Sequence, residues 1–94
     1  MVGLSRIVET EIGSSSFVKI LTAEKRPRYV KIQNDNLEKV YISFDRIVDE
    51  KDAMILYPYE SFEIYTKKKI LAKAEKSTNL KLRIVELLEE DDEV

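Results

Sequence analysis

The chain has 94 residues, a length that suits one domain with one core. It contains no cysteine and no histidine, which excludes disulfides, thiolate nucleophiles, sulfur-based zinc sites and the side chain that most often acts as general base. No run approaches the roughly 20 apolar residues of a membrane span, and residues 1–21 lack the basic start and apolar block of a signal peptide. We therefore expect a soluble, cytoplasmic protein.

Charge is abundant and unevenly distributed. Charged residues make up 36% of the chain, against about 25% in an average domain, and amide residues are few, a composition that resembles hyperthermophilic, including archaeal, proteins. The formal net charge of −2 combines residues 1–85, with 16 basic and 12 acidic residues, and residues 86–94, with six acidic residues and no basic one. We expect one folded domain over residues 1–88 and a disordered acidic tail over residues 89–94.

Apolar and polar residues alternate along most of the chain, which is the period of strands that cover a core on one side. In chain order, the predicted strands occupy residues 6–12, 17–22, 28–33, 40–44, 53–57, 61–65, 70–75 and 80–87. The clearest stretch is 28–44, where two alternating arms flank Asn34-Asp35-Asn36 and predict a β-hairpin. Seven or eight short strands about ten residues apart predict an all-β fold, a single antiparallel β-sandwich that is jelly-roll-like or a barrel.

The strand pattern also predicts the core. The residues expected to face inward are Val18, Ile20, Val30, Ile32, Val40, Ile42, Phe44, Ile55, Phe62, Ile64, Ile70, Ala72, Leu82 and Ile84. The apolar residues left over are candidates for a subunit interface: Ile7, Leu21, Ile47, Leu56, Leu71, Val85, Leu87 and Leu88. This surplus predicts a homo-oligomer, either a dimer or a trimer.

Three segments carry a resemblance to a known family: RYVKIQNDNLEKVYISF, ILYPYESFEIYT and ILAKAEKSTNLKLRIVEL. Their order resembles that of small β-rich structural proteins encoded in tailed-phage and prophage modules, over about residues 22–87. Tyr59 stands where that family usually has glycine, which argues against a positive φ in this turn, and Lys67–Lys69 replaces a less charged turn. The resemblance implies a virion-associated or prophage-derived protein that works by assembling, and it offers no catalytic residue.

A second interpretation is a small OB-like or Sm-like module that binds nucleic acid. Aromatic side chains on a sheet, flanked by basic loops, can stack on bases while lysines hold phosphates. The residues expected to form such a partner surface are Lys25, Arg26, Arg28, Tyr29, Lys31, Tyr41, Tyr65, Lys67, Lys68 and Lys69. Against it stand the absence of an RNP-like motif and a pI near 5.2.

Other candidate sites are weaker. Tyr57 and Tyr59 flank Pro58 and are possible interface anchors. The carboxylate pairs Glu9/Glu11, Asp49/Glu50 and Asp91/Asp92 adjoin no segment that looks buried, as acid–base catalysis would require. The acidic stretch from Asp45 to Asp52 lacks calcium-loop spacing and contains basic residues. We therefore predict no catalytic residue, no metal and no cofactor, and expect a non-enzymatic protein that self-associates.

Overall fold

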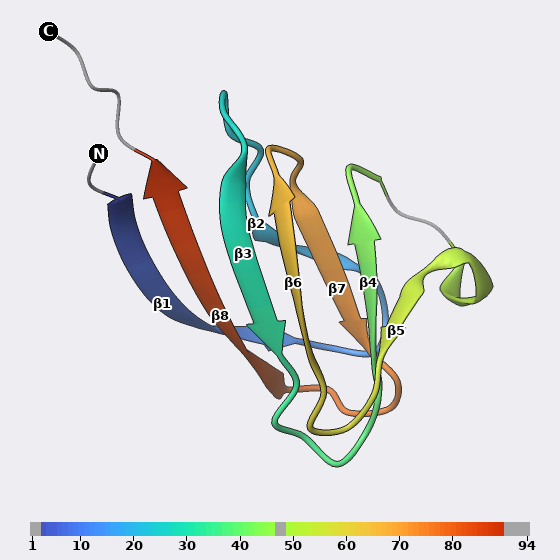
Figure 1. The fold of residues 1–94 in the computed structure, drawn as a ribbon. Helices are drawn as coiled ribbons and strands as arrows, with labels where there is room; N and C mark the ends of the chain where they lie inside the picture. The colour runs from blue at the N-terminus through green and yellow to red at the C-terminus, as the bar shows by residue number, and fades with distance from the viewer. Residues whose placement is uncertain (1–2, 47–48, 90–94) are drawn as a thin grey trace, which may run out of the picture.

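Eight β-strands form two four-stranded antiparallel sheets in the computed structural model, which describes residues 3–46 and 49–89 (Figure 1). They are β1 (Gly3–Ile12), β2 (Val18–Leu21), β3 (Arg28–Gln33), β4 (Val40–Phe44), β5 (Met54–Leu56), β6 (Ser61–Thr66), β7 (Ile70–Ala74) and β8 (Leu80–Glu89), with a 3-10 turn, η1 (Glu50–Asp52), before β5. The first sheet has the order β1-β8-β3-β6 and the second β2-β7-β4-β5. The predicted all-β fold is confirmed.

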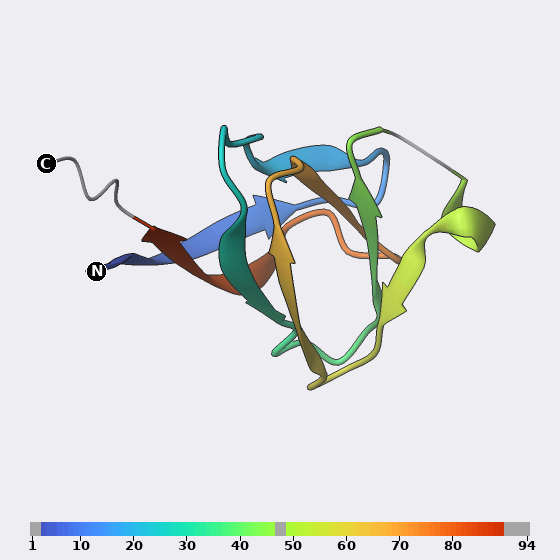
Figure 2. The same ribbon diagram turned by 45° about the horizontal axis from the view of Figure 1, so that its top comes forward.

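The strands pair in a nested pattern: β1 with β8, β2 with β7, β3 with β6, and β4 with β5. The chain is therefore one long antiparallel ribbon that turns back between β4 and β5, and it is rolled up so that β3 also pairs with β8 and β4 with β7. Eight strands in two sheets rolled in this way form a jelly roll. Figure 2 shows the two sheets as opposite walls, with the ribbon of β1 and β8 extending to one side.

This topology sorts the connections between two ends of the sandwich. One end carries the β2–β3, β4–β5 and β6–β7 connections, and the other carries the β1–β2, β3–β4, β5–β6 and β7–β8 connections (Figure 1). Loops that are distant in sequence therefore lie together. Both ends carry residues that the sequence had suggested for binding.

The predicted hairpin over residues 28–44 is wrong. Strand β3 belongs to the first sheet and β4 to the second, so residues 34–39 cross between the sheets. A hairpin is favoured by a two-residue turn with glycine, whereas these six residues are long enough to span the roughly 10 Å between packed sheets. Asn34 is buried at the crossing instead of turning a hairpin in solvent.

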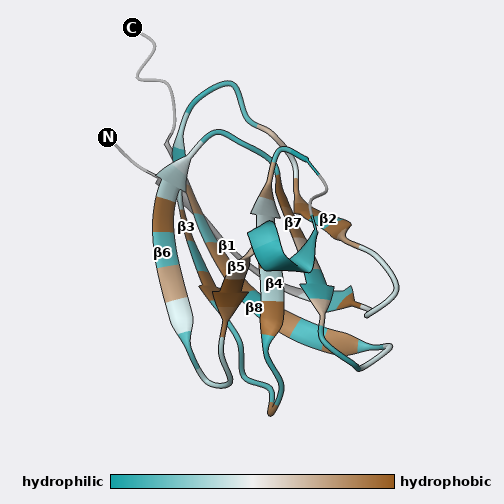
Figure 3. Ribbon diagram, turned by 90° about the vertical axis from the view of Figure 1, so that its right-hand side faces the viewer, coloured by the Kyte–Doolittle hydropathy of each residue, from teal (hydrophilic) through white to brown (hydrophobic). Residues whose placement is uncertain are grey.

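The core lies between the sheets and follows the predicted alternation at most positions (Figure 3). It contains Ile12, Ile20, Leu21, Val30, Ile32, Val40, Ile42, Leu56, Ile70, Ala72, Ala74, Leu82 and Ile84, with Phe44, Phe62, Ile64 and Leu80 partly buried against it. Leu21 joins Ile20 in the core because the register shifts between Lys19 and Leu21. Val18 was predicted inside, but it lies on the edge strand β2 and is 37% exposed.

Strand β5 has the opposite phase from the prediction. Met54 and Leu56 oppose the core residues Ile42 and Val40 and so share their inner face, whereas Ile55 opposes Tyr41 on the outer face. The apolar run from Ala53 to Tyr57 contains no charged residue to fix which side faces solvent. Leu56 and Leu21, proposed as interface residues, are therefore buried in the core of the chain itself.

A second apolar cluster covers the outer face of the second sheet. Phe17, Tyr41 and Leu71 are each 7% exposed and pack together, with Ala53 and Ile55 against them. The prediction that Tyr41 lies on an exposed face is therefore wrong, because Phe17 from the β1–β2 connection covers it. Leu71, another interface candidate, is buried in the same cluster.

Some predictions fall at or beyond the limits of the described chain. Glu89, predicted to begin the acidic tail, is the last residue of β8 and pairs with Gly3. Residues 90–94 and Ile47 lie outside the described residues, as do the side chains of Ile7 and Leu88. Within residues 3–46 and 49–89, no helix is long and apolar enough to cross a membrane.

Candidate functional site

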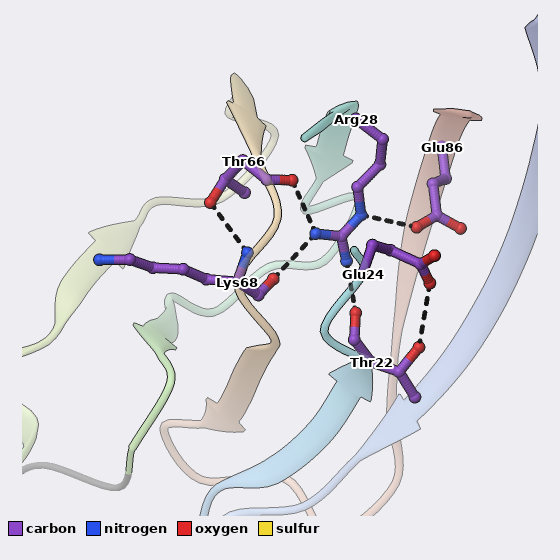
Figure 4. Close-up of polar contacts among 6 residues, drawn as sticks. All are labelled: Thr22, Glu24, Arg28, Thr66, Lys68 and Glu86. Atoms are coloured by element: carbon purple, nitrogen blue, oxygen red, sulfur yellow. Dashed lines mark hydrogen bonds and ion pairs between the residues drawn. The ribbon is translucent and has the colours of Figure 1, made fainter. Parts of the chain in front are cut away.

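Arg28 lies buried at one end of the sandwich, at the start of β3. Its Nε donates to Glu86 Oε2 on β8 at 2.8 Å, Nη1 donates to the carbonyls of Thr66 and Lys68 at 2.7 and 2.9 Å, and Nη2 donates to the Thr22 carbonyl at 2.7 Å (Figure 4). We call these five residues the Arg28 network. Its guanidinium is enclosed by protein, so the prediction that Arg28 contacts a partner at the surface is wrong.

The Arg28 network holds two basic connections together. Thr22 begins the β2–β3 connection, which carries Lys25 and Arg26. Thr66 ends β6, and Lys68 is the middle residue of the β6–β7 connection of Lys67 to Lys69. A backbone bond from Glu24 N to Lys67 O, 2.9 Å long, joins the same two segments. In Figure 4 the Lys68 side chain leads away from Arg28 while its carbonyl faces the guanidinium. A buried arginine therefore arranges a group of exposed cations.

Two predicted tyrosines lie next to this end. Tyr29 and Tyr65 are directly opposite each other on β3 and β6, on the outer face of the first sheet, because their neighbours Val30 and Ile64 belong to the core side. Tyr65 is 57% exposed, and Lys31 follows Tyr29 on the same face. A hydrogen bond to Glu63, together with burial and the charge of Glu63, raises the pKa of Tyr29 above its ordinary value.

The opposite end is organised by Asn34. Its Nδ2 donates to the carbonyls of Glu38, Leu56 and Tyr57 at 2.9, 3.0 and 3.2 Å, and its backbone pairs with Glu60 and Tyr59 at 2.8 and 2.7 Å. The β3–β4 and β5–β6 connections are thereby fixed to each other. The exposed side chains they carry include Leu37, Tyr57 and Tyr59, which are 83%, 52% and 66% exposed.

Tyr59 adopts a backbone conformation that the sequence argued against. Its φ is 63°, and Glu60 N donates to Tyr57 O at 3.0 Å, so Pro58 and Tyr59 occupy the two central positions of a type II turn. The inference that a tyrosine here precludes positive φ is wrong. Its backbone N–H donates to Asn34 O, and this bond, with the Pro58 turn, holds the residue there.

Strand β6 forms one edge of the first sheet. It pairs with β3, and no strand among residues 3–46 and 49–89 lies on its other side. The Asn34 N–H donates to Glu60 O, and this pair continues the register of β3 with β6. In an antiparallel pair, hydrogen-bonded and non-hydrogen-bonded positions alternate. The even-numbered residues of β6 therefore bond to β3, and the odd-numbered residues direct their N–H and C=O groups to the edge. Beside this edge Phe62 and Ile64 are only half-buried.

The carboxylate pairs noted in the sequence form no metal-binding group in the part of the chain that the structure describes. Asp49 and Glu50 are exposed, and Glu50 pairs with Lys73. No three His, Cys, Asp or Glu side chains converge to hold a metal among the described residues. Asp91 and Asp92 lie outside them, as does the Glu9 side chain.

The sequence brought out the basic and aromatic residues but missed those that arrange them. The sequence predicts Asn34 as a turn residue and Glu86 as part of the acidic C-terminal stretch. One signal for Glu86 was available: it continues the inward alternation of Leu82 and Ile84 on β8. A scan against models of protein families and a search of curated proteins both find no match for this chain.

Proposed function

We propose that this chain is a non-enzymatic structural protein that assembles by antiparallel pairing of β6 with β6 of a second copy. The observation that carries the proposal is the β6 edge, whose outward backbone groups can continue the hydrogen-bond ladder of the first sheet. Its sequence, SFEIYT, combines aromatic and β-branched residues with a single charge and no proline.

The other edges are better protected against strand pairing. Strand β5 has three residues, and β2 has four, with Lys19 and a shift of register. Strand β1 has ten residues but carries Arg6, Glu9 and Glu11. Short strands, lysines, irregularities and charges are the devices by which edges avoid pairing. Strand β6 is long enough to pair and lacks all of these devices except one glutamate.

Self-complementarity selects one register. Pairing must keep the inner residues of one β6 opposite the inner residues of the other. In an antiparallel pair of identical strands this holds only when one residue lies opposite its own copy, so the two-fold axis passes through that residue pair. An axis at Glu63 would place two carboxylates opposite each other, which destabilises a sheet. An axis at Ile64 instead opposes Ile64 to its own copy, Phe62 to Thr66, and Glu63 to Tyr65. This register joins two first sheets into one eight-stranded sheet and covers the half-buried Ile64.

The fold and the resemblance to phage structural proteins support the same kind of role. Jelly rolls occur in viral capsid proteins and also in lectins and cupins, so the fold permits assembly without requiring it. We propose that the protein works in the cytoplasm or in association with a virion. Its work there would be done by contacts between copies of the chain.

Size-exclusion chromatography with light scattering tests the proposal. The wild-type chain should be a dimer at micromolar concentration, and Glu63→Pro should be a monomer because proline removes a donor that points to the edge while sparing the ladder to β3. Glu63→Ala is the matched control: it loses the same side chain, keeps the backbone N–H and should remain dimeric. A wild-type protein that is monomeric at high concentration would refute the proposal.

A further inference from the structure

We propose that the outer face of β3 and β6, together with the two basic connections beside it, binds single-stranded nucleic acid. This function is separate from self-association, since the surface is complete in one copy of the chain. Its elements are the cross-strand pair of Tyr29 and Tyr65 and the lysines that the Arg28 network places at the end of the same strands.

The charge of this surface differs from that of the whole chain. The charged residues of the β2–β3 and β6–β7 connections and of the outer faces of β3 and β6 are Lys25, Arg26, Lys31, Lys67, Lys68 and Lys69, against Glu24 and Glu63. Glu86 is buried against Arg28 and faces away from solvent. A local excess of cations attracts phosphates whatever the net charge of the protein.

The aromatic pair specifies the kind of polyanion. Tyr65 is 57% exposed and Tyr29 half-exposed, side by side on a sheet surface. Bases that are already unstacked can lie on such rings, whereas the bases of a duplex are held in their own stack. Basic loops at the end of the strands would then follow the sugar-phosphate backbone.

The Arg28 network holds the basic side chains of the β2–β3 and β6–β7 connections close together before any ligand binds. Three hydrogen bonds from the Arg28 guanidinium fix the Thr22, Thr66 and Lys68 carbonyls in and beside both connections, and a fourth goes to Glu86 on β8. The lysines therefore project from a frame that is already ordered. A preorganised site loses less conformational freedom on binding. The buried Arg28 therefore fixes the positions of the connections that carry the exposed lysines.

Fluorescence anisotropy with a labelled single-stranded oligonucleotide of about ten nucleotides tests the proposal, at about 50 mM salt, where phosphate contacts are strong. Lys67→Glu with Lys68→Glu should weaken binding at least about tenfold and flatten its salt dependence. The matched control, Lys76→Glu with Lys81→Glu, makes the same charge change at exposed lysines of the opposite end and should leave affinity within about twofold. Tyr65→Leu should weaken binding at least about fivefold through lost stacking.

The outcomes separate this proposal from the preceding one, because the two double lysine variants change no residue of β6, and light scattering on both should show an unchanged oligomeric state. No binding of the wild-type protein to DNA or RNA oligonucleotides would overturn the proposal, and so would equal losses in the two double variants. Unchanged affinity in Tyr65→Leu, or tighter binding of duplex than of single strands, would overturn the assignment to single-stranded nucleic acid. Loss of the dimer in Glu63→Pro with binding retained would leave this proposal standing by itself.

Discussion

Arg28 and Glu86 are oppositely charged side chains buried in the protein interior, where an ionised group is destabilising unless it is paired. Their side chains are 1% and 0% exposed, and removing charges from water costs several kcal/mol per ion unless partners replace the solvent. Arg28 meets this requirement because its planar fork reaches a carboxylate and three carbonyls at once. The pair therefore ties β8 to two connections as well as neutralising itself.

Lysine should not replace this arginine. Arg28→Lys keeps the charge but offers one nitrogen in place of the fork, so some of the four acceptors lose their donor. We expect the free energy of unfolding to fall by roughly 2–4 kcal/mol, measured by urea denaturation. Arg83→Lys is the control, because its pair with Asp35 is solvent-exposed and the change should cost less than about 0.5 kcal/mol. Equal effects of the two substitutions would contradict this account of Arg28.

Tyr59 carries backbone strain together with an exposed ring. A left-handed conformation costs an L-residue roughly 1–2 kcal/mol, and a side chain that is 66% exposed gains little from packing. Tyr59→Gly should therefore raise the free energy of unfolding by about 1 kcal/mol. Tyr57→Gly, without positive φ to relieve, should lower it by about 0.5–1 kcal/mol, and a loss in both would contradict the assigned strain.

At the scale of elements, Glu38 in the β3–β4 connection is hydrogen-bonded to the β7–β8 connection. Its carboxylate accepts the Ser77 hydroxyl and the backbone N–H groups of Lys76 and Ser77, the latter two at 2.7 and 3.0 Å. The Ser77 hydroxyl, followed by the Lys76 N–H, holds the pKa of Glu38 below its ordinary value. The ionised form is therefore the one that the folded state prefers.

The pH dependence of stability follows from the sign of that shift. A carboxylate with a lowered pKa in the folded state contributes its full stabilisation above its unfolded pKa, and this is lost as the pH falls through the folded pKa. Glu38→Gln should remove that part of the acid dependence in denaturation measured from neutral pH to about pH 3. Parallel curves for wild type and variant would contradict this role of Glu38.

Strand positions could be predicted from the sequence, but strand partners could not. A period of two places residues on an inner or an outer face, and it located all eight strands to within a few residues. The inner faces of two packed sheets look alike in sequence, so nothing in residues 28–44 showed that the two arms belong to different sheets. Asn34 illustrates the problem, since the same residue type suits a solvent turn and a buried crossing.

Across the whole molecule, the nested pairing decides which predicted site residues meet. Lys25 and Arg26 lie beside Lys67 to Lys69 because β2 and β7, and likewise β3 and β6, are partners in the rolled ribbon. Arg28 and Tyr41 were predicted at the surface but are buried. Arg28 pairs with the buried Glu86, and Phe17 covers Tyr41. Neither contact can be predicted from the charge or polarity of the residue alone. The exposed residues of the candidate site could thus be predicted from the sequence, and the buried residues that support them could not.

The same topology leaves the β6 edge at one side of the first sheet, with an axis through Ile64 if two copies pair. The chain has no cysteine, so a thiol introduced at position 64 reports directly on this geometry. Opposed residues of a non-hydrogen-bonded antiparallel pair have Cα atoms about 4.5 Å apart, which falls within the range of a disulfide. Position 62 would oppose Thr66 instead of its own copy.

Oxidative cross-linking of Ile64→Cys therefore tests the central claim most directly, with Phe62→Cys as the matched control on the same face of β6. The account predicts that Ile64→Cys forms a covalent dimer of twice the 11.0 kDa chain mass, seen by non-reducing electrophoresis, while Phe62→Cys cross-links much more slowly. An Ile64→Cys protein that stays monomeric under oxidation, or that cross-links no faster than Phe62→Cys, would contradict it.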